Sequence, residues 1–119
     1  MLTDDWMLRQ VDGLARSLAK LVLKKDSADY LPTGAEEDAA LDALHLRLVE
    51  LLAAGDVGGG EDLLFQESHW DDLRYLEVAV DFYTRANTLT DDQLDQAGFD
   101  RQELQEGLQE LAARYGVIL

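Results

Sequence analysis

The sequence predicts an all-α fold of five to six helices, on the strength of two observations. Apolar residues recur at intervals of three and four over several long stretches, which is the period of an amphipathic helix. Apart from isolated short runs, no stretch alternates between apolar and polar residues over the length of a β-strand. The 119 residues are the size of one domain. We therefore expect a single helical domain over 1–119, built either as an array of helical hairpins or as an irregular bundle.

The first predicted helix runs from Asp4 to Leu23 and is followed by a loop. Its apolar stripe consists of Met7, Val11, Leu14, Leu18, Leu21 and Val22. Residues 26–34 contain the only proline together with Ser, Asp, Thr and Gly residues, a composition typical of a loop. A second helix, from Ala35 to Ala54, is apolar over most of its circumference, so we expect it to be buried.

The glycine-rich stretch after the second helix predicts the elbow of a helical hairpin. Gly55 has the position of a residue that ends a helix with positive φ, and Asp56 can cap the next helix. The run 58–60 favours a close approach of two helices, with Gly60 touching the facing helix and a third helix over 60–66. A phosphate-binding loop is rejected, because no Lys-Ser/Thr follows the glycines and the flanking residues are acidic.

The fourth predicted helix is capped by Asp71 and ends near Ala86. A short fifth helix over 91–97 begins with Thr90 and Gln93, which have the spacing of a capping box. These signals place two helices in the stretch between the hairpin and the last helix.

The last predicted helix follows a second capping-box spacing, that of Asp100 and Glu103, and runs to about Tyr115. Gly107 lies in its middle, where glycine costs up to about 1 kcal/mol relative to alanine. We therefore expect Gly107 to allow a close contact with a neighbouring helix.

The charge of the chain excludes some partners and favours others. The net charge is −15, from 25 acidic and 10 basic residues, which argues against binding nucleic acid and suits a basic partner. Residues 1–25 hold five basic and three acidic residues, whereas the rest holds five basic and twenty-two acidic ones. No apolar run is long enough to cross a membrane, and the start lacks the positive charge of a secretory signal. With no cysteine in the chain, we expect a cytoplasmic protein without a membrane partner.

The residues that could carry chemistry are few. Asp42 lies one helical turn before His45 and could orient its imidazole or share a metal, but one histidine and one carboxylate make an incomplete site. His69 lies in a predicted loop and would need ligands from elsewhere. Paired acidic residues fall mostly in first helical turns, where the helix dipole explains them without catalysis. The sequence therefore assigns no catalytic residue, no cofactor and no metal.

Two stretches resemble known families. The run 48–56, LVELLAAGD, followed by Gly60 and Phe65, resembles one tetratricopeptide-type helical hairpin, although the proline that usually closes such a repeat is missing. The opening DWMLRQVDGLARSLA, over 5–19, together with the layout of the chain, is similar to a bacterial family of unknown function from Firmicutes, DUF6483. That resemblance implies a small helical cytoplasmic protein and brings no activity or site residues.

These observations predict a non-enzymatic helical module for protein–protein interaction. A partner helix or peptide, favoured to be basic, would lie in a groove between helices. The candidate contacts are of residue types common at binding hot spots, and they are Trp70, Arg74, Tyr75 and Tyr83. A homodimer through the first helix or the tail 117–119 is the simplest version. The alternative is a small-ligand or metal-binding protein, or an enzyme, that uses carboxylates near His45 or His69.

Overall fold

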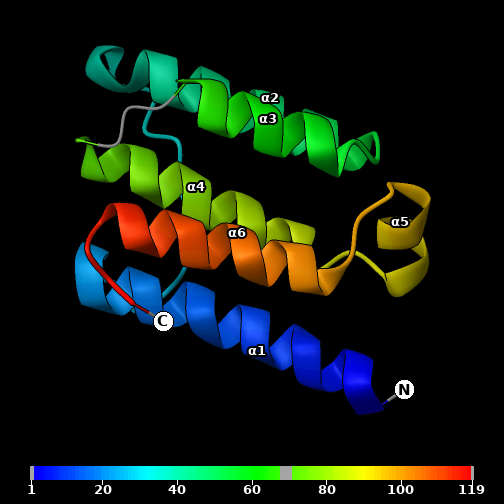
Figure 1. Cartoon of the computed structure of the whole chain (residues 1–119). Helices are drawn as coiled ribbons and strands as arrows, with labels where there is room; N and C mark the ends of the chain where they lie inside the picture. Colours follow the sequence, from blue (N-terminus) through cyan, green and yellow to red (C-terminus); the bar gives the residue numbers. More distant parts are fainter. Residues whose placement is uncertain (1, 68–70, 119) are drawn as a thin grey trace.

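The structure is a computed structural model that describes residues 2–67 and 71–118. Over these ranges it contains six α-helices and no strand, which confirms the all-α prediction (Figure 1). The helices are α1 (Leu2–Leu18), α2 (Ala39–Ala53), α3 (Val57–Glu67), α4 (Leu73–Ala86), α5 (Asp91–Gln96) and α6 (Arg101–Arg114). A π-helical turn, η1 (Ala19–Leu23), extends α1, and a 3-10 turn, η2 (Glu36–Asp38), precedes α2.

Helix α4 is the centre of the fold. It packs against α1, α2, α3 and α6, with α2 and α3 on one side and α1 and α6 on the other (Figure 1). Nine of its residues are buried, because its apolar and aromatic side chains point in nearly all directions around the axis. The other helices each bury one face against it or against a neighbour, as in an irregular bundle.

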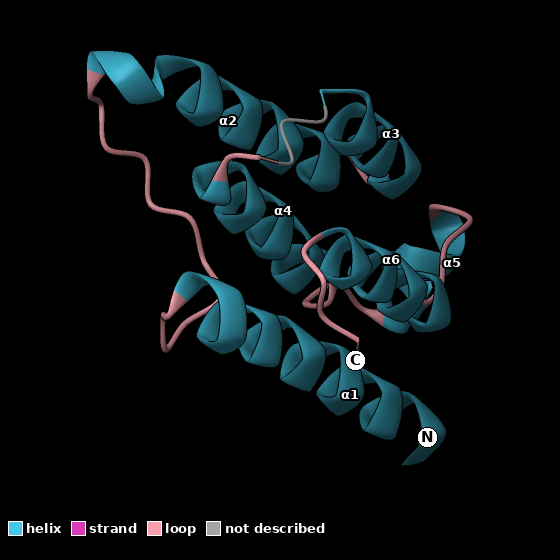
Figure 2. Ribbon diagram, turned by 60° about the vertical axis from the view of Figure 1, so that its left-hand side comes forward, coloured by secondary structure: helices cyan, strands magenta, loops and turns pink. Residues whose placement is uncertain are grey.

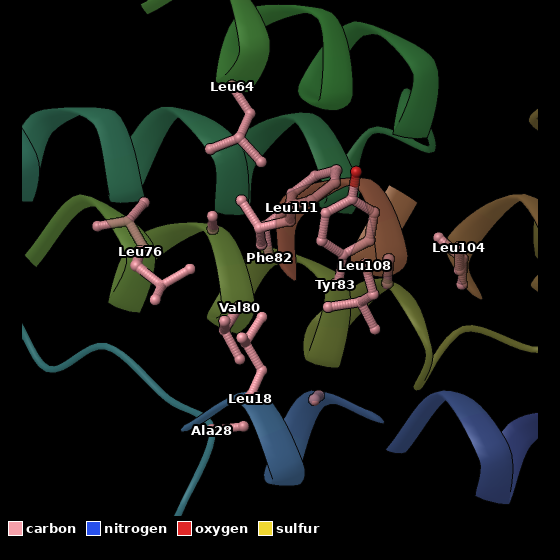
Figure 3. Packing of buried hydrophobic residues seen from close by; sticks show 14 of the residues in the cluster. Leu18, Ala28, Leu64, Leu76, Val80, Phe82, Tyr83, Leu104, Leu108 and Leu111 are labelled. Carbon is pink, nitrogen blue, oxygen red and sulfur yellow. The ribbon is translucent and has the colours of Figure 1, made fainter. Parts of the chain in front are cut away.

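The hydrophobic core lies around α4 and joins every long helix. Leu18 of α1 reaches Val80, whereas Leu64 of α3 lies on the opposite side of α4, near Phe82 (Figure 3). Leu108 of α6 packs beside the same helix. The core therefore joins helices from both ends of the chain, with α1 packed against both α4 and α6.

The first helix follows the prediction except near its end. Its buried face includes Val11 and Leu18, as predicted, whereas Leu21 is 55 % exposed and does not belong to the stripe. The π-helical turn over 19–23 explains the difference, because its wider turn rotates later side chains away from the face set by the preceding α-helix. Lys24 then ends the helix with φ of 59°.

The elbow between α2 and α3 is present, but its glycines act differently from the prediction. Gly55 has φ of +79°, as predicted. The third helix begins at Val57 rather than Gly60, so all three glycines of the run 58–60 form its first turn. The Asp56 carboxylate accepts a hydrogen bond from the Gly59 N–H at 2.9 Å. This cap stabilises the first turn of α3, whose three glycines have a low helix propensity. A Cβ on Gly60 would lie 3.0 Å from Phe82 Cζ, so Gly60 contacts α4.

The later helices begin at side-chain caps. The cap of α4 is Asp72, which accepts from the Arg74 N–H at 2.9 Å, rather than the predicted Asp71. Thr90 and Gln93 form the predicted capping box of α5. The Asp100 carboxylate accepts from the Glu103 N–H at 2.9 Å at the start of α6, which is one of the two bonds of the predicted capping box.

Candidate functional site

The long loop 24–35 runs along one side of the molecule from α1 to α2 (Figure 2). Polar side chains hold it in place. The Tyr30 N–H donates to Asp81 Oδ1 at 3.0 Å, and the Tyr30 hydroxyl donates to Asp42 Oδ1. The Gly34 N–H donates to the other oxygen of Asp42 at 3.1 Å. We call Tyr30, Asp42 and Asp81 the loop clasp. It satisfies backbone groups that a loop lying on the core would otherwise leave unpaired.

The loop clasp changes the acidity of its members. The hydrogen bond from Tyr30, followed by backbone bonds, holds the pKa of Asp42 below its usual value. Burial and the Asp42 carboxylate raise the pKa of Tyr30 to about 12. Both shifts favour the charge states that the hydrogen bond needs, with a neutral phenol as donor and a carboxylate as acceptor. The clasp is therefore complete at neutral pH.

His45 is buried against the loop clasp. Its Nδ1 lies 3.3 Å from Asp81 Oδ2, and its ring centre lies 5.1 Å from that of Tyr30. The orienting contact from Asp42 that the spacing allowed is not formed, because Asp42 accepts hydrogen bonds from the Tyr30 hydroxyl and the Gly34 N–H. Asp81 also accepts from Arg85 Nε at 2.7 Å. Within 2–67 and 71–118, no group of three or more His, Cys, Asp or Glu side chains is placed to hold a metal. His69 lies outside the described residues.

Of the four predicted partner contacts, Arg74 is the one that the structure places near the surface. Its guanidinium lies 4.9 Å from the centre of the Tyr30 ring and 3.2 Å from a Glu77 carboxylate oxygen. The side chain remains 39 % exposed, so its contact with a partner stays a prediction. Trp70 lies outside the described residues.

The two predicted tyrosines lie in the core. Both are fully buried, and the Tyr75 hydroxyl donates to the Leu64 carbonyl. The Tyr83 hydroxyl donates to Glu61 Oε2 at 2.6 Å, and burial together with that carboxylate raises the pKa of Tyr83. Their rings pack within the fold in this conformation, so the surface available to a partner has to be sought elsewhere.

An acidic hollow lies between α3 and α6. We call it the α3–α6 groove, and its volume is about 440 Å³. Its lining is Glu61, Asp62, Phe65, Glu103, Glu106, Gly107, Glu110 and Arg114. Five of these eight residues are acidic, and the one basic residue among them is Arg114. Its guanidinium contacts two of its neighbours, since it lies 3.3 Å from a Glu110 carboxylate oxygen and 5.4 Å from the centre of the Phe65 ring. The groove therefore combines negative charge with an aromatic surface.

Glu61 lies deepest in the charge network of the groove. Burial raises its pKa, and the nearby carboxylates of Asp62, Glu110 and Glu103 act in the same direction. The hydrogen bond from Tyr83 opposes them. A raised carboxyl pKa means that the groove holds its negative charge at a cost, which a cation placed there would reduce.

A second hollow, of about 520 Å³, lies beside the start of α6. Its acidic lining residues are Asp91, Asp92, Asp95 and Asp100. Its one base, Arg101, is buried and donates to the backbone carbonyls of Asn87 and Leu89 at 2.8 and 2.7 Å. That arginine connects α6 to the chain before α5, so it serves the fold.

The acidic residues of the α3–α6 groove were not singled out from the sequence. Glu103, Glu106 and Glu110 recur at three and four residues, which is a signal that they share a helix face. Glu61 and Asp62 lie more than 40 residues earlier, and only the packing of both α3 and α6 against α4 brings the two sets together.

Comparisons with known proteins give a family without an activity. A family model described as "Family of unknown function (DUF6483)" matches residues 1–116, which confirms the predicted resemblance to that family. No curated protein and no solved structure matches the chain. The likeness of the α2–α3 hairpin to a tetratricopeptide repeat stays a prediction. None of the described helices is both long and apolar enough to span a membrane.

Proposed function

The chain belongs to DUF6483, a family of unknown function, and we propose that it is a non-enzymatic interaction module that holds a basic segment of a partner protein in the α3–α6 groove. The single observation that carries this proposal is the lining of the groove, where five carboxylates surround one arginine and an aromatic ring. A lysine or arginine side chain would place its apolar stem against Phe65 and its charge among the carboxylates.

The electrostatics of the groove support a basic partner in two ways. A net charge of −15 attracts basic molecules from a distance and speeds their encounter. Close contact then depends on the groove, where the carboxylates of Glu103 and Glu106 are exposed and ready to form ion pairs. A partner with positive charges at helical or extended spacing could meet several of them at once.

The proposal is tested with a fluorescently labelled peptide of alternating lysine and alanine, whose binding is measured by fluorescence anisotropy. The double substitution Glu103→Gln and Glu106→Gln should weaken binding about 5- to 30-fold, since each lost surface pair is worth up to about 1 kcal/mol. The matched control is Glu36→Gln with Glu37→Gln, which changes the net charge equally at exposed positions outside the groove.

Equal weakening by both double variants would show that only the overall charge matters, and the groove would then not be the binding site. Absence of binding by the wild-type chain would also contradict the proposal. Spermine is added as a competitor, because a site for a basic protein segment should still prefer the peptide to a polyamine at equal charge concentration.

The alternative function, a small-ligand or metal site near His45 or His69, has weaker support. The His45 imidazole is buried between Tyr30 and Asp81 and lines neither hollow described above. A thermal shift assay with zinc and with a chelator checks this alternative. A chelator-sensitive melting temperature that is lost in His45→Gln or His69→Gln would revive it.

A further inference from the structure

Arg114 already makes, inside the α3–α6 groove, the contacts that the proposed function gives to a cation of the partner. Its guanidinium carbon lies 5.4 Å from the centre of the Phe65 ring, and its Nη2 lies 3.3 Å from Glu110 Oε1. The first distance is that of a cation–π interaction, and the second is that of an ion pair. The chain therefore contains an example of how this groove holds a guanidinium group.

The two contacts bridge the walls of the groove. Phe65 belongs to α3, whereas Glu110 and Arg114 belong to the last turns of α6, and both helices pack against α4. The side chain of Arg114 thus reaches from one wall to the other. A cation that enters the groove and approaches the Phe65 ring has to meet this side chain.

The bridge is of a kind that exchanges readily. The Arg114 side chain is 40 % exposed and that of Glu110 is 61 % exposed. Exposed ion pairs contribute little to stability, because water and salt screen them and both long side chains lose rotamer freedom. A guanidinium group from another molecule could therefore take the place of Arg114 at little cost.

The charge of the groove exceeds what Arg114 can neutralise. Arg114 pairs with Glu110, and four further carboxylates line the same groove, those of Glu61, Asp62, Glu103 and Glu106. These carboxylates attract any cation, but the Phe65 ring favours arginine. A planar guanidinium stacks on an aromatic face and can pair with a carboxylate through two hydrogen bonds, whereas an ammonium is a compact and strongly hydrated charge.

We infer that the basic segment presents an arginine to the groove, and that Arg114 occupies the place of that arginine in the free protein. The inference rests on the proposed function, and it names both the recognised side chain and a competitor within the chain. On binding, the guanidinium of the segment takes the Phe65 ring and the Glu110 carboxylate, and Arg114 turns to solvent. The free protein therefore binds more weakly than the groove would without Arg114.

The inference is tested by fluorescence anisotropy with two labelled peptides, one of alternating arginine and alanine and one of alternating lysine and alanine. The wild type should bind the arginine peptide at least about threefold more tightly, because only a guanidinium stacks well on the ring. Arg114→Gln should raise the affinity for the arginine peptide about two- to sixfold, which is the effect of removing a competing surface contact of ordinary strength.

Three further variants separate the competition from charge and from the fold. Arg47→Gln removes the same charge at an exposed position on α2 outside the groove, and it should raise the affinity less than about 1.5-fold. Arg114→Lys keeps the charge and should still raise the affinity for the arginine peptide. Phe65→Leu should abolish the preference for arginine while the lysine peptide still binds. Circular dichroism checks each fold, since Phe65 packs partly against the core.

An NMR titration of the wild type follows the competitor directly. The Nε–H resonance of Arg114 should move as the arginine peptide is added, because its guanidinium leaves the Phe65 ring. A resonance that stays in place while the peptide binds overturns the inference.

The binding data give two further ways for the inference to fail. It is overturned if the arginine preference survives Phe65→Leu, or if Arg114→Gln raises the affinity no more than Arg47→Gln does. The proposed function stands alone if, in either case, the lysine peptide still binds and is weakened by Glu103→Gln with Glu106→Gln.

Both proposals fail together under a different result. In that case Glu103→Gln with Glu106→Gln weakens neither peptide more than the matched control, Glu36→Gln with Glu37→Gln. The groove would then not be the site at which either basic peptide binds.

Discussion

At the scale of single residues, the missing side chain of Gly107 makes room for a buried tyrosine. A Cβ on Gly107 would lie 2.7 Å from Tyr83 Cε1 and Cζ, closer than carbon atoms pack. The Tyr83 hydroxyl cannot simply swing away, because it donates to Glu61 and its ring is fully buried. The predicted close contact at Gly107 is confirmed, and its partner is a side chain of α4.

Gly107→Ala should therefore destabilise the fold. Overpacking costs about 1–3 kcal/mol, and the better helix propensity of alanine returns up to about 1 kcal/mol of that. Urea unfolding followed by circular dichroism measures the net loss. Gly13→Ala is the control, since its Cβ meets nothing within 4 Å, and it should stabilise by about 0.5–1 kcal/mol. Equal effects at the two glycines would contradict the packing argument.

At the scale of elements, the loop between α1 and α2 is held in place by the loop clasp. Lys25 Nζ adds to it by donating to the Asp29 carbonyl at 2.7 Å and to Glu77 Oε1 at 3.0 Å. The clasp joins the loop to α2 through Asp42 and to α4 through Asp81. It fixes the path of a long connection that has no regular structure of its own.

Tyr30→Phe should raise the pKa of Asp42 towards its ordinary value, because the hydrogen bond from Tyr30 is the largest cause of its lowering. A carboxyl group whose pKa is lowered by folding stabilises the folded protein at pH values above its pKa in the unfolded chain, about 3.9. This stabilisation is lost as the pH falls through the pKa of the group in the folded protein. The stability difference between wild type and Tyr30→Phe should thus shrink on acidification below pH 4.

An NMR titration of the carboxyl groups measures the pKa of Asp42, and urea unfolding at neutral and acidic pH measures the free energy of unfolding. Tyr115→Phe is the control, because its phenol faces the charges of Asp72 and Asp71 rather than Asp42. An Asp42 pKa that stays low in Tyr30→Phe would show that the backbone donors dominate.

At the scale of the whole molecule, the excess of negative charge opposes compaction. The net charge is −15, and residues 1–25 carry five basic and three acidic groups whereas the rest of the chain carries five and twenty-two. Helices α1 and α6, which pack together, each carry two basic and three acidic residues, and the surplus of bases in 1–25 lies beyond α1, in Lys20, Lys24 and Lys25. The excess of acidic groups therefore repels itself within the folded chain, and this repulsion is open to screening by salt.

The melting temperature should therefore rise as NaCl increases from 0.01 to 0.5 M, because the Debye length falls from about 30 Å to under 10 Å over that range. Differential scanning calorimetry measures the change. Choline chloride, whose cation is bulky, should give a similar rise if screening is the cause. A melting temperature that falls with either salt would contradict the role given to self-repulsion.

Local patterns in the sequence were sufficient for the fold class and for several features of single elements. Gly55 ends a helix with positive φ, and Thr90 with Gln93 forms a capping box, as predicted. Both features depend on residues within a few positions of each other, where backbone sterics and hydrogen bonding act without help from the rest of the fold. Errors such as Asp71 for Asp72 were shifts of one residue between equivalent side chains.

Only the tertiary structure decided which polar groups meet. Tyr30 and Asp81 are 51 residues apart in the chain, and His45 finds Asp81 rather than its helical neighbour Asp42. The α3–α6 groove likewise joins Glu61 to Glu110 across two intervening helices. The spacing of apolar residues predicts which face of a helix is buried. The partner of that face depends on how all the helices pack together. The sequence alone therefore determined the helices of this protein, and packing determined its surfaces.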